Sequence, residues 1–286
     1  MQVALKIKAK LGECPRWHAQ QKKLYWTDIN NFRLNCFEPE SGKNEFLQFD
    51  EEIGCFSFRR NGGFVLAMRS GFYLLDGWNA DLKKICDPEA DLEKTRFNDG
   101  RCDARGRFIA GSYYPPKDYD GANLWSLGDN DEVIKLADDL LTANGTAFSP
   151  DNKFLYYSDT PKHRIYRCNY DIDTGRASNR TVFCEFPHGQ GRPDGASVDV
   201  EGYYWAALYE GARIVRIDPQ GKIVNEIPVP ARCPTMVAFG GENLTTLYVT
   251  SVGDRPQDEL GQYPDSGSIF QMEVDVPGLE EYFFAH

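Results

Sequence analysis

The chain has 286 residues, of which 41% are hydrophobic and 26% charged, and its 43 acidic and 32 basic residues give a formal net charge of −11. This apolar content is too high for a disordered chain, and no apolar run reaches the roughly 18 residues of a membrane-spanning helix, so we expect no membrane partner. The acidity argues against nucleic acid, because phosphate binding requires a basic face, and it suits a cation or an uncharged substrate better.

The first ten residues contain no apolar stretch typical of a secretion signal, so we expect a cytoplasmic protein. Val3, Leu5 and Ile7 alternate with small or charged residues. This alternation predicts a strand, which we expect to close the last unit of the fold. Eight cysteines are scattered without any C-x-x-C pair. We interpret them as reduced core residues rather than zinc ligands or a disulfide framework.

A short β-rich element recurs six times, at intervals of 40 to 48 residues. The copies are Leu24-Tyr25-Trp26, Phe64-Val65-Leu66, Phe108-Ile109-Ala110, Leu155-Tyr156-Tyr157, Tyr203-Tyr204-Trp205 and Leu247-Tyr248-Val249. Alternating segments such as 164–168 and 213–217 follow, as expected of antiparallel strands. Repeats of about 45 residues are typical of propeller blades. We therefore predict an all-β, six-bladed β-propeller in one domain, 1–286, rather than chance hairpins in a sandwich or barrel.

Four polar side chains precede copies of this element by 9 to 11 residues. They are Glu13, Asn98, Asn144 and Asp194. Similar offsets imply equivalent positions in different blades, so these groups would point at one shared centre. Carboxylate and amide oxygens are hard ligands that suit Ca²⁺, Mg²⁺, Mn²⁺ or Fe²⁺.

Each of these motifs could also be an ordinary turn, since Asn-Gly and Asp-Gly are common hairpin turns. Glu13 could be a surface residue, and Arg96 could pair with Glu93 in solvent. The four histidines lack metal-motif spacing, and the chain contains no G-x-S-x-G, Walker A or G-x-G-x-x-G sequence. The chemistry therefore depends on carboxylates and amides.

Several segments resemble the gluconolactonase / senescence marker protein (regucalcin) / luciferin-regenerating enzyme family. They run the length of the chain and comprise residues 11–17, 24–29, 97–103, 144–151, 193–195 and 238–241. The resemblance implies a six-bladed propeller, in agreement with the repeat. It also implies that Glu13, Asn144 and Asp194 hold one divalent metal and that Arg96 and Asn98 contact the substrate.

One segment departs from the family pattern. Some members carry a glutamate shortly after an Ala-Gly-Thr stretch, whereas residues 110–116 here read Ala-Gly-Ser-Tyr-Tyr-Pro-Pro. Tyr113 or Tyr114 would then supply a hydroxyl or a stacking face for a sugar. The departure affects the choice of substrate more than the reaction.

The resemblance further implies hydrolysis of a sugar lactone, such as a glucono- or pentonolactone, to its aldonic acid. The metal would act as a Lewis acid on the lactone carbonyl, with Ca²⁺ as first choice and Zn²⁺, Mn²⁺, Mg²⁺ or Fe²⁺ as alternatives. Asp194 is the candidate general base, and a metal-held hydroxide is the alternative nucleophile. Asp99 is a second acid/base candidate for which a role in a turn is favoured.

Three other functions are considered. The same ligands would serve a calcium-binding regulatory protein without catalysis, although such a protein does not need Arg96 and Asn98 beside the ion. A propeller scaffold for protein partners would show an exposed apolar top surface. Phosphotriester hydrolysis could use the same metal. Because a closed propeller needs no partner, we expect a monomer.

Overall fold

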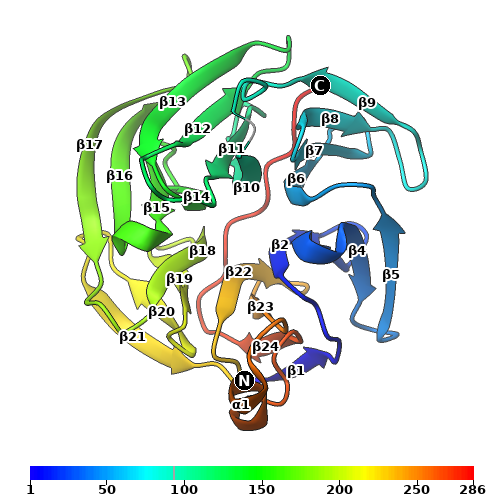
Figure 1. Cartoon of the computed structure of the whole chain (residues 1–286), viewed down its shortest axis with the longest axis vertical. Coiled ribbons are helices and arrows are strands. Elements are labelled where there is room, and N and C mark those ends of the chain that lie inside the picture. The colour runs from blue at the N-terminus through cyan, green and yellow to red at the C-terminus, as the bar shows by residue number, and fades with distance from the viewer. Residues whose placement is uncertain (93) are drawn as a thin grey trace.

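The computed structural model describes residues 1–92 and 94–286, and over these residues the chain forms six four-stranded antiparallel sheets. The sheets are arranged radially around a common centre, as Figure 1 shows, and we call the space enclosed by the innermost strands the central channel. Neighbouring innermost strands contact one another around the ring, and the innermost strands of the last and first sheets meet. The prediction of a six-bladed β-propeller is therefore confirmed.

Each blade is numbered in chain order and given from its innermost to its outermost strand. Blades 1 to 3 comprise β2 (Gly12–His18), β3 (Lys23–Asp28), β4 (Arg33–Glu38) and β5 (Lys43–Gln48); β6 (Ile53–Phe58), β7 (Phe64–Met68), β8 (Gly71–Leu75) and β9 (Leu82–Cys86); β10 (Arg96–Cys102), β11 (Phe108–Tyr113), β12 (Ala122–Leu127) and β13 (Val133–Leu140). Blades 4 to 6 comprise β14 (Ala143–Phe148), β15 (Phe154–Asp159), β16 (Arg164–Asp171) and β17 (Arg176–Glu185); β18 (Arg192–Val198), β19 (Tyr204–Tyr209), β20 (Arg213–Ile217) and β21 (Ile223–Pro228); β22 (Pro234–Gly240), β23 (Thr246–Ser251), β24 (Ile269–Glu273) and β1 (Gln2–Leu5).

The N-terminal strand closes the ring as expected. β1 pairs antiparallel with β24, with Val3 opposite Phe270 and Leu5 opposite Ile269. The strand ends at Leu5, so the expectation that Ile7 belongs to it is wrong. Because β1 completes the last blade, the first and last strands of the chain are held in one sheet, and each of the six described sheets has four strands.

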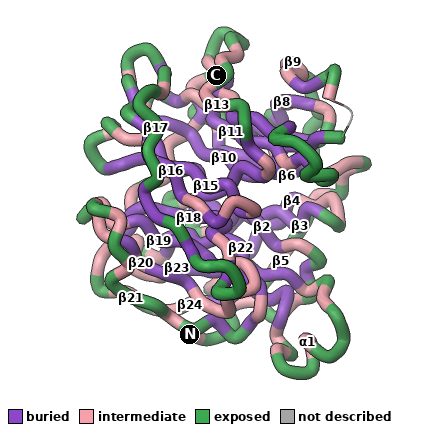
Figure 2. The backbone as a smooth tube through the Cα atoms, turned by 60° about the vertical axis from the view of Figure 1, so that its left-hand side comes forward, coloured by how far each residue is buried: buried purple, intermediate pink, exposed green. Residues whose placement is uncertain are grey.

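The repeated element of the sequence is the second strand of every blade. Its apolar side chains pack between neighbouring sheets, and those of Leu24, Leu66, Leu155 and Leu247 are fully buried. Figure 2 shows burial concentrated in the inner strands, while outer strands such as β17 and β21 and the short helix α1 (Gln257–Gln262) are largely exposed. The eight cysteines are unpaired, and all except the half-buried Cys86 are buried. The core therefore lies between the blades.

Helical structure is limited to α1 and two short 3-10 turns, η1 (Ile29–Asn31) and η2 (Thr160–Lys162), among residues 1–92 and 94–286. Across the same part of the chain, no helix has the length and apolar character needed to span a membrane.

The C-terminal segment crosses the end of the channel at which the innermost strands finish (Figure 1). Gly278 bridges Asp199 beyond β18, and Phe284 bridges Arg59 beyond β6. Between these two anchors, the carboxylate of Glu281 enters the channel and lies 3.5 Å from Arg16 and 3.2 Å from Arg101. The segment thus joins blades that are far apart in the ring.

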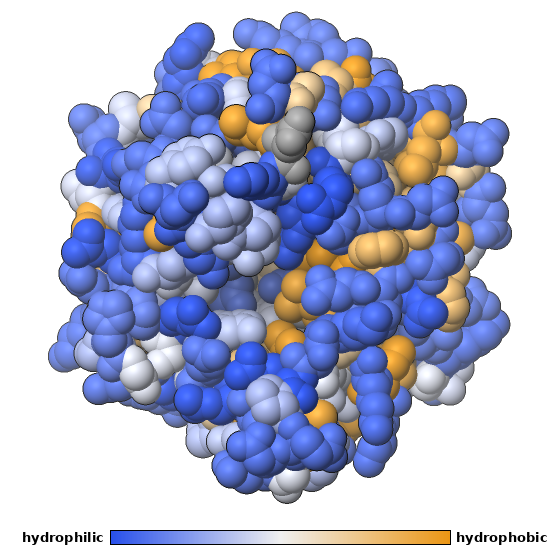
Figure 3. Space-filling model, in the orientation of Figure 1, coloured by the Kyte–Doolittle hydropathy of each residue, from blue (hydrophilic) through white to orange (hydrophobic). Residues whose placement is uncertain are grey.

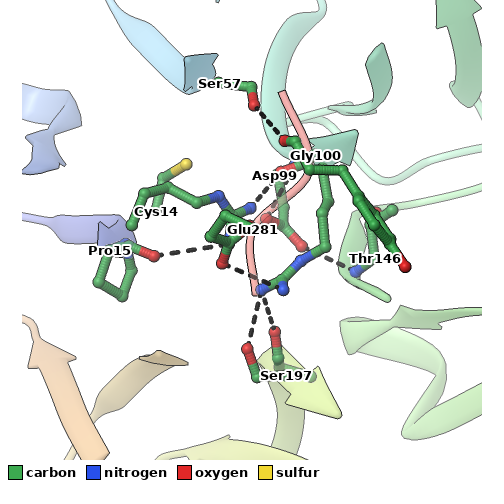
Figure 4. A network of polar contacts seen from close by, with 12 residues as sticks. Cys14, Pro15, Ser57, Asp99, Gly100, Thr146, Ser197 and Glu281 are labelled. Atoms are coloured by element: carbon green, nitrogen blue, oxygen red, sulfur yellow. Dashed lines mark hydrogen bonds and ion pairs between the residues drawn. The ribbon is translucent and has the colours of Figure 1, made fainter. Parts of the chain in front are cut away.

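We call Glu281, Arg16 and Arg101 the Glu281 cluster; Figure 4 shows its contacts. The two guanidinium groups also donate to backbone carbonyls, Arg16 to Gly100 and Arg101 to Ala196. Burial alone would lower the pKa of Arg16, but the negative groups around it, Glu281 foremost, together raise the pKa and keep this guanidinium charged. Burial and repulsion from Arg16 still lower the pKa of Arg101, so the chain supplies part of the counter-charge in this half of the channel.

Candidate active site

A cavity of about 190 Å³ opens at the other end of the channel, where the innermost strands begin. Six of the eight residues that the sequence analysis singled out line it, and these six come from blades 1, 3, 4 and 5. They are Glu13, Arg96, Asn98, Tyr113, Asn144 and Asp194. Residues separated by up to 181 positions in the chain are thereby brought to one cavity.

A break in strand pairing places these side chains. Every innermost strand has an irregular register near its start, and four of the breaks begin within one residue of a predicted site residue. The breaks lie at Glu13/Arg16, Ile53/Cys55, Phe97/Asp99, Asn144/Ala147, Pro193/Ala196 and Pro234/Val237. Such bulges turn a side chain out of the regular alternation and are common beside active sites. Glu13, Asn98, Asn144 and Asp194 therefore lie in strands, and the alternative that they form ordinary turns is wrong.

Two carboxylates face this cavity in a buried setting. Glu13 is 5% exposed and Asp194 is 4% exposed. Burial raises the pKa of Glu13 well above its ordinary range, and the negative charges of Asp194 and Asp99 raise it further. Burial, followed by the charge of Asp99, also raises the pKa of Asp194. Arg96 and Arg192 offset only part of these effects, so the pair lacks a sufficient counter-charge.

A chain of hydrogen bonds across blades 3 and 4 fixes the amides. Arg96 donates to Asn98 Oδ1 (2.8 Å), and Asn98 Nδ2 donates to Asn144 Oδ1 (2.7 Å). Asn144 Nδ2 in turn donates to Thr160 (2.8 Å). Asn144 is thereby oriented with its carbonyl oxygen toward Asn98, and a second lone pair on that oxygen remains for a ligand. Glu93, the alternative partner for Arg96, lies outside the described residues.

The donor set fits a hard divalent cation. Glu13 and Asp194 offer two carboxylates whose buried negative charge is not fully compensated, and the oriented Asn144 oxygen lines the same cavity. Among residues 1–92 and 94–286, no group of three or more His, Cys, Asp or Glu side chains is placed to hold a metal. The candidate site therefore consists of two carboxylates and an amide, which leaves room for water or substrate oxygens.

The two tyrosines proposed for substrate contact have different surroundings. Tyr113 lines the cavity, and the Arg96 guanidinium lies 4.9 Å from the centre of its ring. Tyr114 is buried, donates its hydroxyl to Asp118 (2.8 Å) and packs against Tyr119. Of the two, Tyr113 is the one placed to meet a ligand.

Asp99 does not line the cavity. It belongs to β10, so the expectation of a turn at this position is wrong. Its carboxylate accepts hydrogen bonds from the backbone amides of Gly100 (2.8 Å) and Thr146 (3.0 Å). These bonds join blade 3 to blade 4, and they point to a structural role beneath the site rather than an acid/base role.

The sequence analysis missed two basic residues that line the cavity, Lys117 and Arg192. Arg192 stands two residues before Asp194, and a basic residue beside a candidate ligand was the signal that could have identified it. Lys117 lies between β11 and β12 with a positive φ of 54°. Nothing in its local sequence marks it, because only the fold brings its segment over the channel.

The fold and these motifs have clear relatives. The family model described as "SMP-30/Gluconolactonase/LRE-like region" matches residues 11–253. The chain is 45% identical over 277 residues to 6-deoxy-6-sulfogluconolactonase from Pseudomonas putida, which covers 96% of this chain and 95% of the relative. It is 33% identical over 280 residues to pentonolactonase XacC from Haloferax volcanii, covering 96% and 94% of the two chains.

A solved structure shares the whole fold. Regucalcin from Agrobacterium tumefaciens, described as a calcium-binding protein, superimposes with a TM-score of 0.95 at 25% identity and covers 100% of this chain and 97% of its own. Together with the match over residues 11–253, these similarities show that the chain belongs to the SMP-30/gluconolactonase/LRE-like family.

Proposed function

We propose that this chain, acting as a single domain over residues 1–286 and as a monomer, hydrolyses a sugar lactone to its aldonic acid with one divalent metal ion. The observation that carries the proposal is the pair of buried, incompletely compensated carboxylates, Glu13 and Asp194, beside the Arg96–Asn98 pair in one cavity. The relatives named as lactonases support this class of reaction.

The proposed roles follow from position. A divalent cation held by Glu13, Asn144 and Asp194 would supply Lewis acidity toward the lactone carbonyl oxygen and keep both carboxylates ionised. Asp194 is our candidate for the base that takes a proton from the attacking water. Arg96 and Asn98 orient the ring oxygens, and the ring C–O bond breaks as the ring oxygen gains the proton that Asp194 took from water. Ca²⁺ is our first choice of metal.

The test is a pH-indicator assay that crosses aldonolactones with divalent metals. Gluconolactone, galactonolactone, xylonolactone and arabinonolactone are each offered with Ca²⁺, Mg²⁺, Mn²⁺, Zn²⁺ or Fe²⁺ after chelation, and spontaneous hydrolysis is subtracted. We expect the chelator to abolish hydrolysis and at least one metal to restore it. Rates that survive the chelator would contradict the metal-dependent mechanism.

The alternatives give different outcomes in the same assay. A calcium-binding regulatory protein would bind the ion but would hydrolyse none of the lactones. A phosphotriesterase would instead release product from an activated phosphotriester. The scaffold alternative required an apolar top surface, but the face in Figure 3 is mostly hydrophilic and the exposed large apolar residues are spread over different blades.

A further inference from the structure

The cavity contrasts in charge with the chain as a whole. The chain carries a net charge of −11, which by itself favours a cation or an uncharged substrate. The cavity, however, is lined by three basic side chains, Arg96, Lys117 and Arg192, against two carboxylates. On the proposed function, Glu13 and Asp194 are balanced by a divalent cation, so the basic residues remain to be matched by something else.

The charged form of Lys117 is disfavoured at this cavity. Although the residue is exposed, burial of its ammonium lowers its pKa, and repulsion from Arg192 lowers it further. The negative charges of Asp159 and Glu210 raise the pKa of Lys117, but they offset only part of this lowering. Both have other partners, since Asp159 pairs with Lys162 (3.4 Å) and Glu210 with Arg192 (2.7 Å).

The position of Lys117 is specified by its surroundings. Its ammonium lies 5.3 Å from the centre of the Tyr113 ring, which also carries the Arg96 guanidinium. Its backbone is in the left-handed region, which an ordinary side chain adopts only where the local structure demands it. Tyr113 therefore holds two cations toward the same cavity.

Arg192 retains unused donors. One terminal nitrogen donates to Glu210, which also faces Arg255 (3.5 Å) and so shares its charge between two guanidinium groups. The Arg192 Nε–H is buried and has no hydrogen-bond partner among the described residues. Its guanidinium lies over the Tyr209 ring, which lines the cavity. An anion with several oxygens could accept from these donors.

We infer that Lys117 and Arg192 bind a strongly acidic group, a sulfonate or a phosphate, at the end of the lactone remote from its carbonyl. This inference rests on the proposed function, because it is the metal at Glu13 and Asp194 that fixes the carbonyl end. The names of the relatives include a sulfonated and an unsulfonated lactone. On this inference, Lys117 and Arg192 select for the charge that a substrate carries at that end.

The experiment compares gluconolactone with its 6-sulfo-6-deoxy and 6-phospho forms. We expect the wild-type enzyme to favour at least one anionic lactone by about 10- to 100-fold in kcat/KM, the effect of one or two charge-assisted hydrogen bonds. The two anionic arms identify which acid is accepted. Equal or higher kcat/KM for neutral gluconolactone would overturn the inference while leaving the lactonase proposal intact.

The variants separate charge from structure. Lys117→Gln should lower kcat/KM for the preferred anionic lactone by about 10-fold, chiefly through KM, and change that for gluconolactone less than about 2-fold. Lys117→Arg should restore most of the loss, and the exposed Lys153→Gln should change neither substrate. Arg192→Gln should lower kcat/KM for both kinds of lactone, because Arg192 also supports the ionised form of Asp194, but the loss should be larger for the anionic lactones. An equal loss on neutral and anionic lactones, or no loss at all, would contradict the inference.

A binding arm makes the test independent of turnover. In calorimetry, 6-phosphogluconate or 6-sulfo-6-deoxygluconate should bind the metal-loaded wild-type protein more tightly than gluconate does, and Lys117→Gln should remove most of the difference. Equal affinities for gluconate and for the two acids that carry the additional sulfonate or phosphate would overturn the inference. If no lactone is hydrolysed but this difference is observed, the proposed function fails and the anion site stands.

Discussion

The central channel contains two groups of buried charge, and the chain supplies ion pairs to only one of them. In the Glu281 cluster, two arginines share a carboxylate supplied by the C-terminal segment. At the cavity, Glu13 and Asp194 have raised pKa values because burial and repulsion from neighbouring carboxylates exceed the help of nearby cations. The comparison shows that the fold provides an ion-pair partner for its buried arginines, whereas the carboxylates whose charge is less well compensated mark the place for a ligand.

The largest expected effect is on catalysis. Asp194→Asn should lower kcat/KM for lactone hydrolysis by about 100- to 10,000-fold, the range for loss of a positioned base. The free energy of unfolding of the metal-free variant should equal or exceed that of the wild type, because the substitution removes a buried repulsion. Denaturant unfolding and the pH-indicator assay check the two readouts. The exposed Asp138→Asn is the control, and a strongly destabilised Asp194→Asn would remove the contrast between the two charge groups.

Glu281→Gln should act in the opposite sense. It leaves Arg16 and Arg101 buried without their shared carboxylate, which should cost about 3–5 kcal/mol in the free energy of unfolding. The folded fraction should keep its KM, because Glu281 lies at the other end of the channel. Urea unfolding and steady-state kinetics check this, with the exposed Glu280→Gln as matched control. A loss of activity without a loss of stability would instead assign Glu281 to the site.

Two substitutions of Tyr113 distinguish contact through its ring face from contact through its hydroxyl. If its ring face stacks on the sugar, Tyr113→Phe should change KM less than about 2-fold, while Tyr113→Ala should raise it up to about 10-fold. The measurement is KM against kcat for both variants. A large effect of Tyr113→Phe would show that the hydroxyl, and not the face, makes the contact.

The smallest effect concerns pH. Because the folded-state pKa values of Glu13 and Asp194 are raised, the folded protein binds protons more readily than the unfolded chain, and stability falls as pH rises through those values. The Tm of the chelated protein should therefore rise by roughly 2–4 °C as pH is lowered from neutral toward the ordinary pKa range of carboxyl groups, about 4. Asp194→Asn should flatten this dependence, and saturating metal should suppress it. A Tm that instead falls as pH is lowered over this range would contradict the raised pKa values.

The sequence predicted the fold and the location of the candidate site because both repeat. Each second strand carries the recurring apolar triplet, and Glu13, Asn98, Asn144 and Asp194 stand at matched offsets before it. The sequence did not predict the bulges that turn these residues inward, because no residue type at these positions marks an irregular strand register. Lys117 and Glu281 were missed for a related reason. Each reaches the channel from a segment outside the repeated strands.

The closing segment also sets the order in which the ring can be assembled. Glu281 follows every strand of the propeller along the chain, and β1 must wait for β24 before it can pair. A growing polypeptide therefore carries Arg16 and Arg101 without their partner until all six sheets have been made. Chains truncated before residue 281 should be degraded rather than accumulate as open rings, because the segment after β24 supplies the charge that makes the closed form stable.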